Sequence, residues 1–310
     1  MTSENRTASA HRYRARWILP LDGEPIENGV VEIRGGHIAA LDGGGDSNAV
    51  ELGNSAVIPG LVNCHVHLEF SDLEQPLKPA EPFTDWIRAL VAHRRECRAN
   101  PADLVRRGRS ECLQTGTTVL AEITTDEASL AVLDEDGPTP LALREIIGLR
   151  PEQIEQQAAA GRLRGTAGRG AARECRARCP PAQYSVHVEL YRRLVDLAGR
   201  RRAVVAIHLA ETREELELLN LGTGPFVEML RQFGAWSDGV FPRGSRPIDY
   251  LRVLEPLDRA LIVHGNYLDR EEIDFIAARP QLAVVYCPRT HAYFGHEAHC
   301  WLELMERGGS

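Results

Sequence analysis

The chain has 310 residues, 43% of them hydrophobic, which is enough for a substantial core in one large or two modest domains. Its formal net charge of −8 argues against nucleic acid or an anionic membrane as the main partner. No window approaches the ~18 apolar residues of a membrane helix, and no secretory signal is recognisable. The 7 cysteines are scattered and odd in number, which favours a reduced, cytoplasmic protein.

The first 56 residues differ from the remainder in their pattern of apolar and turn-forming residues. Residues 1–13 are expected to form a mobile tail. Between residues 15 and 56, short apolar runs alternate with Gly, Pro, Asn and Asp, which are strand and turn signals typical of a small antiparallel sheet. We therefore expect two parts, residues 1–56 and residues 57–310.

From residue 57 onward, apolar strands alternate with amphipathic helices. Strands are expected within 56–68, 117–124, 139–149, 201–210, 259–268 and 281–290, and helices within 83–97, 101–116, 214–222, 225–234 and 270–280. Strands that are apolar throughout indicate a parallel sheet covered on both faces. The pattern predicts an α/β fold, either a (β/α) barrel or a doubly wound sheet.

A basic stretch at residues 161–179 contains six arginines. It could contact RNA, but it has no interleaved aromatic residues and the chain is acidic overall. A solvated loop and helix face is the preferred interpretation.

Histidines stand at the ends of three expected strands. His65 and His67 end the first, two residues apart, so that both side chains point to one face. His208 and His264 end two later strands. A pair at this spacing is by itself more often plain strand structure, but active sites lie at the carboxyl ends of parallel strands. The repeated placement therefore predicts a functional site that binds a divalent metal.

A carboxylate follows one of these strand ends. Glu211 lies three residues after His208, in "HLAET", where it is well placed to move protons. A first-turn glutamate that stabilises the next helix is a compatible alternative.

Four segments in this order resemble the amidohydrolase superfamily: "PGLVNCHVHLEF", "AIHLAET", "LIVHGNYLD" and "CPRTHAYFGH". The resemblance spans about residues 15–310 and is strongest to the chlorohydrolase and adenosine-type deaminase branch. It implies a TIM-like (β/α)8 barrel beside a small β-sandwich that includes the N-terminal strands. It also implies one catalytic divalent metal ion, Zn²⁺ or Fe²⁺.

The resemblance assigns roles to individual residues. It implies that His65, His67 and His208 are metal ligands, that Glu211 is the proton shuttle, and that His264 positions the attacking water. Trp86, Arg289 and His291 are expected to line the substrate pocket. Another branch bridges two metals with a carboxylated lysine, but the only lysine, Lys78, stands near the first strand. A single metal is therefore expected.

The resemblance implies a metal-dependent hydrolase, most simply a hydrolytic deaminase of an adenine-type nucleoside derivative. Removal of another leaving group is the alternative, such as chloride or an amine from a triazine, or opening of a cyclic amide. A catalytically inactive remnant is a third possibility.

The chain departs from the family pattern in two places. Pro181 stands where a fourth-strand histidine is usual, and the nearby His187 is expected to be structural. No residue matches the usual eighth-strand aspartate, so the resemblance implies a barrel without its last unit, a truncated family member. Glu69 or Glu122 is the candidate replacement carboxylate. Unpaired strand edges would favour self-association, such as a homodimer.

Overall fold

The structure is a computed structural model that describes residues 10–43, 48–125, 127–160, 177–179 and 182–309. The chain divides into two compact units, Met1–Leu61 and Val62–Ser310, which are described separately. Most of the basic stretch 161–179, and Pro181, lie outside the described residues.

The first unit contains seven short strands in two small sheets. The strands are β1 (Ala10–Arg14), β2 (Trp17–Ile18), β3 (Ile26–Glu27), β4 (Val30–Arg34), β5 (His37–Asp42), β6 (Val50–Glu51) and β7 (Ala56–Val57). The sheet orders are β5-β4-β1-β6 and β3-β2-β7. Ala15, Ile18 and Val31 form the small core.

Two details of the N-terminal expectation are wrong. β1 begins at Ala10, inside the segment expected to be a tail, because residues 10–14 pair with β4 over five positions. The sheets are mixed rather than antiparallel, since β1 pairs with β6 in parallel and β2 pairs with β7 in parallel. Strands distant in sequence therefore lie side by side, which turn signals alone do not reveal.

The second unit is built on a seven-stranded sheet of order β14-β13-β12-β11-β10-β9-β8. The strands are β8 (Leu61–Val66), β9 (Thr117–Thr124), β10 (Thr139–Glu145), β11 (Ala177–Cys179), β12 (Val205–Leu209), β13 (Ala260–His264) and β14 (Leu282–Val285). The pairs from β9 to β14 are all parallel. The expected parallel sheet is confirmed, but among the described residues β8 and β14 do not pair, so the sheet is not closed.

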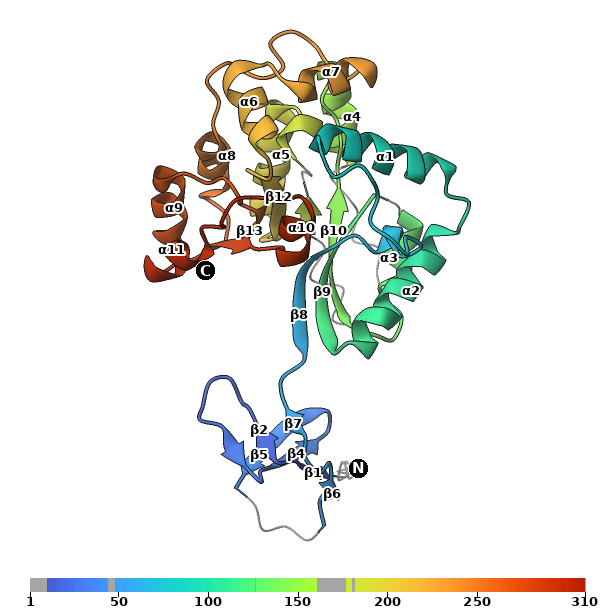
Figure 1. Cartoon of the computed structure of the whole chain (residues 1–310), viewed down its shortest axis with the longest axis vertical. Helices are drawn as coiled ribbons and strands as arrows, with labels where there is room; N and C mark the ends of the chain where they lie inside the picture. The colour runs from blue at the N-terminus through green and yellow to red at the C-terminus, as the bar shows by residue number, and fades with distance from the viewer. Residues whose placement is uncertain (1–9, 44–47, 126, 161–176, 180–181, 310) are drawn as a thin grey trace, which may run out of the picture. The chain divides into compact units, whose positions relative to one another are not determined.

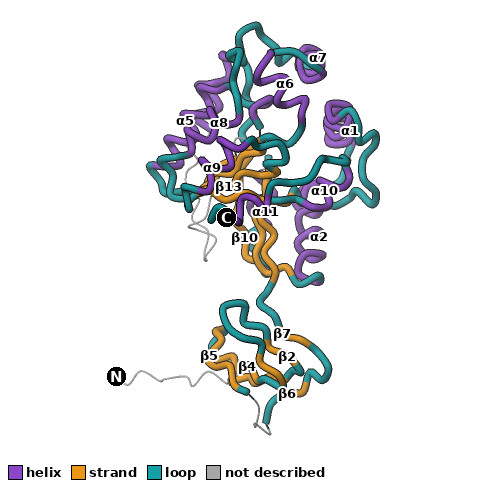
Figure 2. The backbone as a smooth tube through the Cα atoms, turned by 60° about the vertical axis from the view of Figure 1, so that its left-hand side comes forward, coloured by secondary structure: helices purple, strands orange, loops and turns teal. Residues whose placement is uncertain are grey.

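Helices connect and cover these strands (Figure 1). They are α1 (Phe83–Glu96), α2 (Pro101–Gln114), α3 (Glu127–Val132), α4 (Ile154–Ala160), α5 (Val188–Gly199), α6 (Arg213–Leu221), α7 (Pro225–Gln232), α8 (Pro247–Leu254), α9 (Arg270–Ala277), α10 (Pro288–Tyr293) and α11 (Trp301–Glu306), with a 3-10 turn η1 at Leu68–Phe70. The strands of the second unit lie between its helices (Figure 2). No described helix is long and apolar enough to cross a bilayer.

The largest hydrophobic core joins the sheet to helices α5 to α9. Ile207 and Ile262 on neighbouring strands are fully buried, and Leu194 and Leu251 pack against them from helices α5 and α8. Each of the five positions of β12 is buried, as expected for a central parallel strand. This packing fixes the strand ends at which the candidate site lies.

Candidate metal centre

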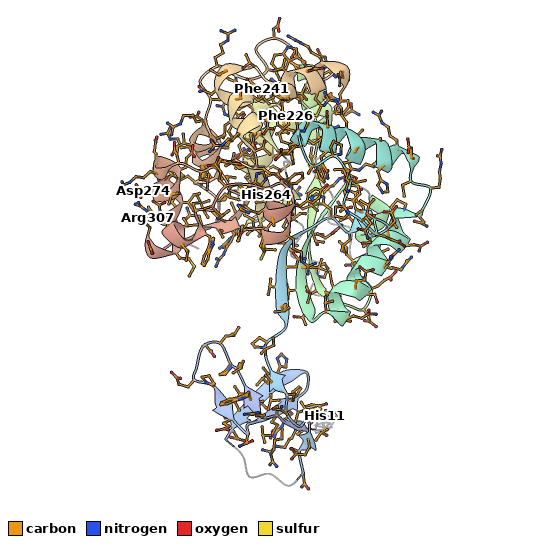
Figure 3. All side chains as sticks on the ribbon, viewed as in Figure 1. His11, Phe226, Phe241, His264, Asp274 and Arg307 are labelled. Atoms are coloured by element: carbon orange, nitrogen blue, oxygen red, sulfur yellow. The ribbon has the colours of Figure 1, made fainter. Side chains whose placement is uncertain are left out.

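Four imidazoles meet at the carboxyl ends of the sheet strands. His65 is the penultimate residue of β8, His67 follows that strand, His208 lies on β12, and His264 is the last residue of β13. The ring centroid of His65 lies 5.0 Å from that of His67, 4.8 Å from His208 and 5.5 Å from His264. His264 lies in the interior of this unit (Figure 3). The structure therefore brings together the histidines that the sequence predicted as a site.

The tightest group of candidate ligand atoms belongs to His65, His208 and His264, each offering one atom within 4.8 Å of the others. His67 is not a member of this group, but its ring centroid lies only 5.7 Å from that of His208. The Nδ1 atoms of His65 and His67 are buried without a hydrogen-bond partner. Buried imidazole nitrogens without partners are costly unless they meet a ligand, so the donor set fits a divalent metal.

Burial favours the neutral form of three of these imidazoles, because it lowers the pKa of His65, His67 and His264. Burial lowers the pKa of His67 to about 3, with the charge of His208 as the next cause. Burial also lowers the pKa of His65 and of His264 well below the usual range, and neighbouring histidines add to the effect. A neutral imidazole has a free lone pair, which is the form that binds zinc and similar metals.

Glu211, the expected proton shuttle, and His264, expected to position the attacking water, are in direct contact. Glu211 Oε1 lies 3.2 Å from His264 Nε2, and both side chains are almost fully buried. Burial raises the pKa of Glu211 well above its usual range, and the charge of Glu215 acts in the same direction. A carboxyl group with a raised pKa can hold a proton near neutral pH and release it to a partner.

The loop that carries Glu211 is held by a second buried carboxylate. Glu215 accepts hydrogen bonds from the backbone N–H groups of Ala210 and Glu211, each at 2.8 Å. The side chain of Thr212 caps helix α6 by accepting from the Glu215 N–H at 3.2 Å. Asn266 donates to the Glu211 carbonyl at 3.0 Å. Ala210 has a φ of +54°, a strained value that these bonds maintain.

A similar arrangement holds the backbone after His67. Glu122, fully buried on β9, accepts the Leu68 N–H with both carboxylate oxygens, at 3.0 and 3.2 Å. Burial raises the pKa of Glu122 well above its usual range. Glu69, the other expected replacement carboxylate, forms an ion pair with Arg94 at 2.7 Å.

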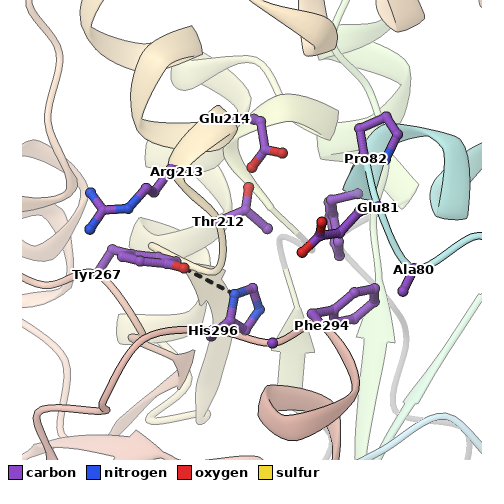
Figure 4. Close-up of a pocket in the computed structure, with 11 residues that line it drawn as sticks. Ala80, Glu81, Pro82, Thr212, Arg213, Glu214, Tyr267, Phe294 and His296 are labelled. Carbon is purple, nitrogen blue, oxygen red and sulfur yellow. Dashed lines mark hydrogen bonds between the residues drawn. The ribbon is translucent and has the colours of Figure 1, made fainter.

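A cavity of about 520 Å³ is lined in part by the three residues that directly follow Glu211 and by Tyr267, three residues after His264. Its lining residues are Ala80, Glu81, Pro82, Phe83, Thr212, Arg213, Glu214, Tyr267, Phe294, Gly295 and His296. The Tyr267 hydroxyl lies 3.1 Å from His296 Nδ1 (Figure 4). Two carboxylates and the aromatic side chains of Phe83, Tyr267 and Phe294 line one space, which suits a ligand with hydroxyl groups and a flat ring.

The lining of this cavity does not include the three expected pocket residues, although Trp86 and His291 contact residues that line it. Trp86 stacks on Phe83 with ring centroids 5.6 Å apart and contacts Phe294 edge-on at 5.3 Å. Arg289 and His291 lie on α10, and His291 Nε2 is 2.7 Å from the Glu297 carbonyl. The lining residues Tyr267 and His296 were within the motifs that carried the family resemblance, although no role was assigned to them.

The structure assigns His187 a structural contact. It caps helix α5, and its Nδ1 accepts the Glu189 N–H at 3.1 Å. This agrees with the structural role expected for His187.

A parallel sheet covered by helices, with a histidine cluster at the carboxyl ends of its strands, defines an α/β protein with a candidate metal centre. The profile described as Amidohydrolase family matches residues 56–309. The chain therefore belongs to the amidohydrolase family.

Several characterised proteins are similar to this chain. An aminodeoxyfutalosine deaminase from Nitratiruptor sp. is 26% identical over 253 residues, covering 78% of this chain and 59% of the relative. A 5-methylthioadenosine/S-adenosylhomocysteine deaminase from Nitratidesulfovibrio vulgaris is 28% identical over 285 residues, covering 86% of this chain and 58% of the relative. The chain thus spans less than two thirds of the length of these relatives.

Solved structures share the fold. The Helicobacter pylori aminofutalosine deaminase in complex with methylthio-coformycin superposes with a TM-score of 0.81 at 18% identity, covering 97% of this chain and 75% of that chain. An adenosine deaminase from Xanthomonas campestris with bound zinc gives a TM-score of 0.69 at 21% identity, covering 96% and 67% respectively. These likenesses show that the chain shares its α/β fold with barrel-type structures, although its own sheet is not closed in the described residues.

Proposed function

We propose that this protein is a metal-dependent hydrolytic deaminase of an adenine-type nucleoside derivative. The observation that carries the proposal is the buried Glu211–His264 pair, 3.2 Å apart, beside His65 and His208. The relatives named as deaminases of aminodeoxyfutalosine and of methylthioadenosine or adenosylhomocysteine support the substrate class.

The metal would be held by His65 and His208, with His67 or His264 completing the set. Neutral imidazoles suit Zn²⁺ or Fe²⁺. A divalent ion bound there supplies Lewis-acid activation of water. The remaining chemistry belongs to the side chains of the protein.

Proton transfer is assigned to Glu211. Its carboxyl group takes a proton from the attacking water and gives it to the departing amine, so that ammonia leaves as a neutral molecule. His264 Nε2 faces Glu211 Oε1 and orients that carboxyl group. Glu215 holds the Glu211 backbone in place by accepting its N–H.

Substrate binding is assigned to the cavity beside these groups. Glu81 and Glu214 can accept hydrogen bonds from sugar hydroxyl groups, and Phe83 and Phe294 offer flat apolar surfaces for a ring. The cavity of about 520 Å³ has the size of a small-molecule site.

The test is ammonia release from a panel of adenosine, methylthioadenosine, adenosylhomocysteine and aminodeoxyfutalosine, with the protein loaded with zinc or iron. Glu211→Gln keeps the shape of the side chain but removes its acid–base function, so we expect a loss of about 10²- to 10⁴-fold in kcat with unchanged metal content. Glu228→Gln, an exposed residue of α7, is the matched control and should retain activity.

Equal rates in wild type and Glu211→Gln would contradict the assignment of Glu211. No turnover across the panel would overturn the deaminase proposal. Chloride release from a chlorotriazine, without ammonia release from any nucleoside, would transfer the proposal to the alternative leaving groups.

A further inference from the structure

A second cluster of metal-ligating side chains lies apart from the histidine group. Asp72, in the loop after η1, faces His93 and Cys97 at the end of helix α1. Each offers one ligand atom, and the three atoms lie within 4.8 Å of one another. We propose that Asp72, His93 and Cys97 form a second metal site, selective for zinc or a similar borderline-soft divalent ion.

Two of the separations between ligand residues are close to those of tetrahedral coordination. His93 Nε2 lies 3.2 Å from Asp72 Oδ1, and Cys97 Sγ lies 3.5 Å from Asp72 Oδ2. With the usual zinc bond lengths, tetrahedral ligands are separated by ~3.3 Å for nitrogen and oxygen and ~3.6 Å for sulfur and oxygen. The ligand atoms of His93 and Cys97 lie within 4.8 Å of each other, so an ion can enter after side-chain adjustments of up to about 1 Å.

The backbone presents the three ligands on one side of the helix end. His93 and Cys97 are four residues apart, and the Cys97 N–H donates to the His93 carbonyl at 2.8 Å, so the last helical turn carries both. All three side chains are partly buried, which limits their freedom while leaving an approach for an ion and a water as fourth ligand.

The donor set also fits by charge and softness. A thiolate and a carboxylate together neutralise a +2 ion, and the thiolate selects zinc over magnesium or calcium. On binding, the Cys97 thiol loses its proton to solvent as the metal–sulfur bond forms. Without metal, hydrogen bonds from the thiol and the imidazole to Asp72 hold the same group together.

The proposed ion would link helix α1 to the segment that follows the candidate ligand His67. Asp72 is five residues from His67, and η1, between them, contacts α1 through the Phe70–His93 rings and the Glu69–Arg94 ion pair at 2.7 Å. A metal at Asp72 would therefore be a structural clamp between the end of α1 and the loop after His67. It would not take part in the chemistry.

Cobalt(II) titration of the full chain tests the site. A cobalt–thiolate bond gives a near-ultraviolet charge-transfer absorption that imidazole and carboxylate ligands do not produce, so the band reports Cys97 and not the histidine group. We expect the band at about one equivalent per chain in wild type. Cys97→Ser keeps a hydrogen-bond donor to Asp72 and should lose the band, whereas Cys112→Ser, a partly buried cysteine on α2, should keep it.

A measurement on wild type alone avoids any dependence on variant folding. Zinc should protect Cys97 from alkylation by iodoacetamide at least tenfold, measured by peptide mass spectrometry, while Cys112 is alkylated at the same rate with and without zinc. Absence of the thiolate band in wild type, its persistence in Cys97→Ser, or equal alkylation of Cys97 with and without zinc would each overturn the proposal.

Failure of this site and failure of the proposed catalytic site are distinguishable. His208→Ala should lower the zinc content and leave the thiolate band unchanged. Cys97→Ser should also lower the zinc content but leave the zinc bound at the histidine cluster unchanged. If His208→Ala leaves the zinc content unchanged while the thiolate band is present, the catalytic metal assignment fails and the second site stands.

Discussion

At the scale of single residues, strand register brings together Glu211 and His264, the proposed catalytic pair. Leu209, the last residue of β12, is directly opposite His264, the last residue of β13, and Glu211 follows two positions after Leu209. Glu211 therefore meets His264 across neighbouring strands, and the surrounding core excludes water from both. Because both groups are buried, the rate of proton transfer between them depends strongly on their separation, and a small movement of either backbone would change it.

Histidine substitutions test the ligand assignments. We expect His208→Ala to lose most of the metal bound at the histidine cluster and His67→Ala to lose less, because the candidate ligand atom of His208 lies in the tight group and that of His67 does not. Zinc content after dialysis, read by elemental analysis in the Cys97→Ser background, separates the two. His187→Ala, which removes only a helix cap, is the control.

Equal zinc in wild type and His208→Ala would contradict the assignment of His208 as a ligand. A larger loss in His67→Ala than in His208→Ala would show that the metal lies nearer to η1 than the tight group indicates.

Glu215→Gln tests the positioning carboxylate. Its pKa is raised to about 7, first by burial, so the folded state holds a proton that the unfolded chain has lost. Stability from this group is thus present below the ordinary carboxyl pKa near ~4.5 and declines as pH rises toward about 7, by up to ~1.4 kcal/mol per pH unit. The variant should flatten this slope in urea melts and lower stability by about 1–3 kcal/mol, since one backbone N–H loses its acceptor.

The exposed Glu228→Gln is the matched control and should reproduce the wild-type slope. An unchanged slope in Glu215→Gln would show that Glu215 does not titrate in this window. A Glu215→Gln variant that keeps full kcat would remove its role in orienting Glu211.

The sequence indicated which side chains the fold brings together at the candidate site better than which residues hold their backbone in place. His208, His264 and Glu211 were found because they follow apolar strands, a local signal. Glu122 was assigned no positioning role, because that role depends on the Leu68 N–H, which lies 54 positions away in the chain and is brought to it by the fold. Glu215 was also assigned none, although the N–H groups of Ala210 and Glu211 that it accepts lie only five and four positions away. A hydrogen-bond partner that is distant in the chain cannot be predicted from the spacing of residues in the sequence.

At the scale of elements, helix α2 approaches η1 at Gly108. A Cβ atom there would lie 2.7 Å from Leu68 Cδ2 and would also clash with Ser71 Oγ. We expect Gly108→Ala to cost about 1–3 kcal/mol through overpacking, which outweighs the ~1 kcal/mol gained in helix propensity. Urea denaturation measures the cost, and metal content should fall because Leu68 follows His67.

Gly199→Ala on α5 is the control, since its Cβ would lie 3.5 Å from Leu257 Cδ2, an ordinary contact. It should leave stability unchanged or raise it by about 0.5 kcal/mol. If Gly108→Ala were as stable as Gly199→Ala, the close approach of α2 to η1 would not be a constraint.

Most elements of the second unit were predictable from periodicity. The strand at 117–124 and the helix beginning at Phe83 agree with the expected bounds. The strand expected over 281–290 ends at Val285, because Pro288 begins helix α10. Helices α5 and α8 were not anticipated, although α8 begins with Pro247 at its first position, a usual helix start.

At the scale of the whole molecule, the local residue pattern distinguished the strand-rich N-terminal part from the α/β part and placed the boundary after residue 56. The structure divides the chain after Leu61. Sequence periodicity could not distinguish a closed barrel from an open sheet, because closure depends on pairing between the first and last strands. In the described residues the outer strands β8 and β14 remain unpaired with each other.

Unpaired outer strands lead to a prediction about association. A strand edge exposes N–H and C=O groups that can pair with a second chain, and Val62 on β8 leaves 62% of its surface exposed. We expect sedimentation velocity to show self-association that increases with concentration. Val62→Lys should weaken it by at least about tenfold, because a lysine at the edge must give up hydration when strands pair.

Leu113→Lys is the matched control, because Leu113 is 50% exposed on α2, away from the sheet edge, and carries the same change in charge. If both lysine variants weaken association equally, the effect is one of net charge and not of the β8 edge. A wild-type chain that stays monomeric across the concentration series would contradict association through either edge, and the free backbone groups of β8 would then have to be satisfied by water.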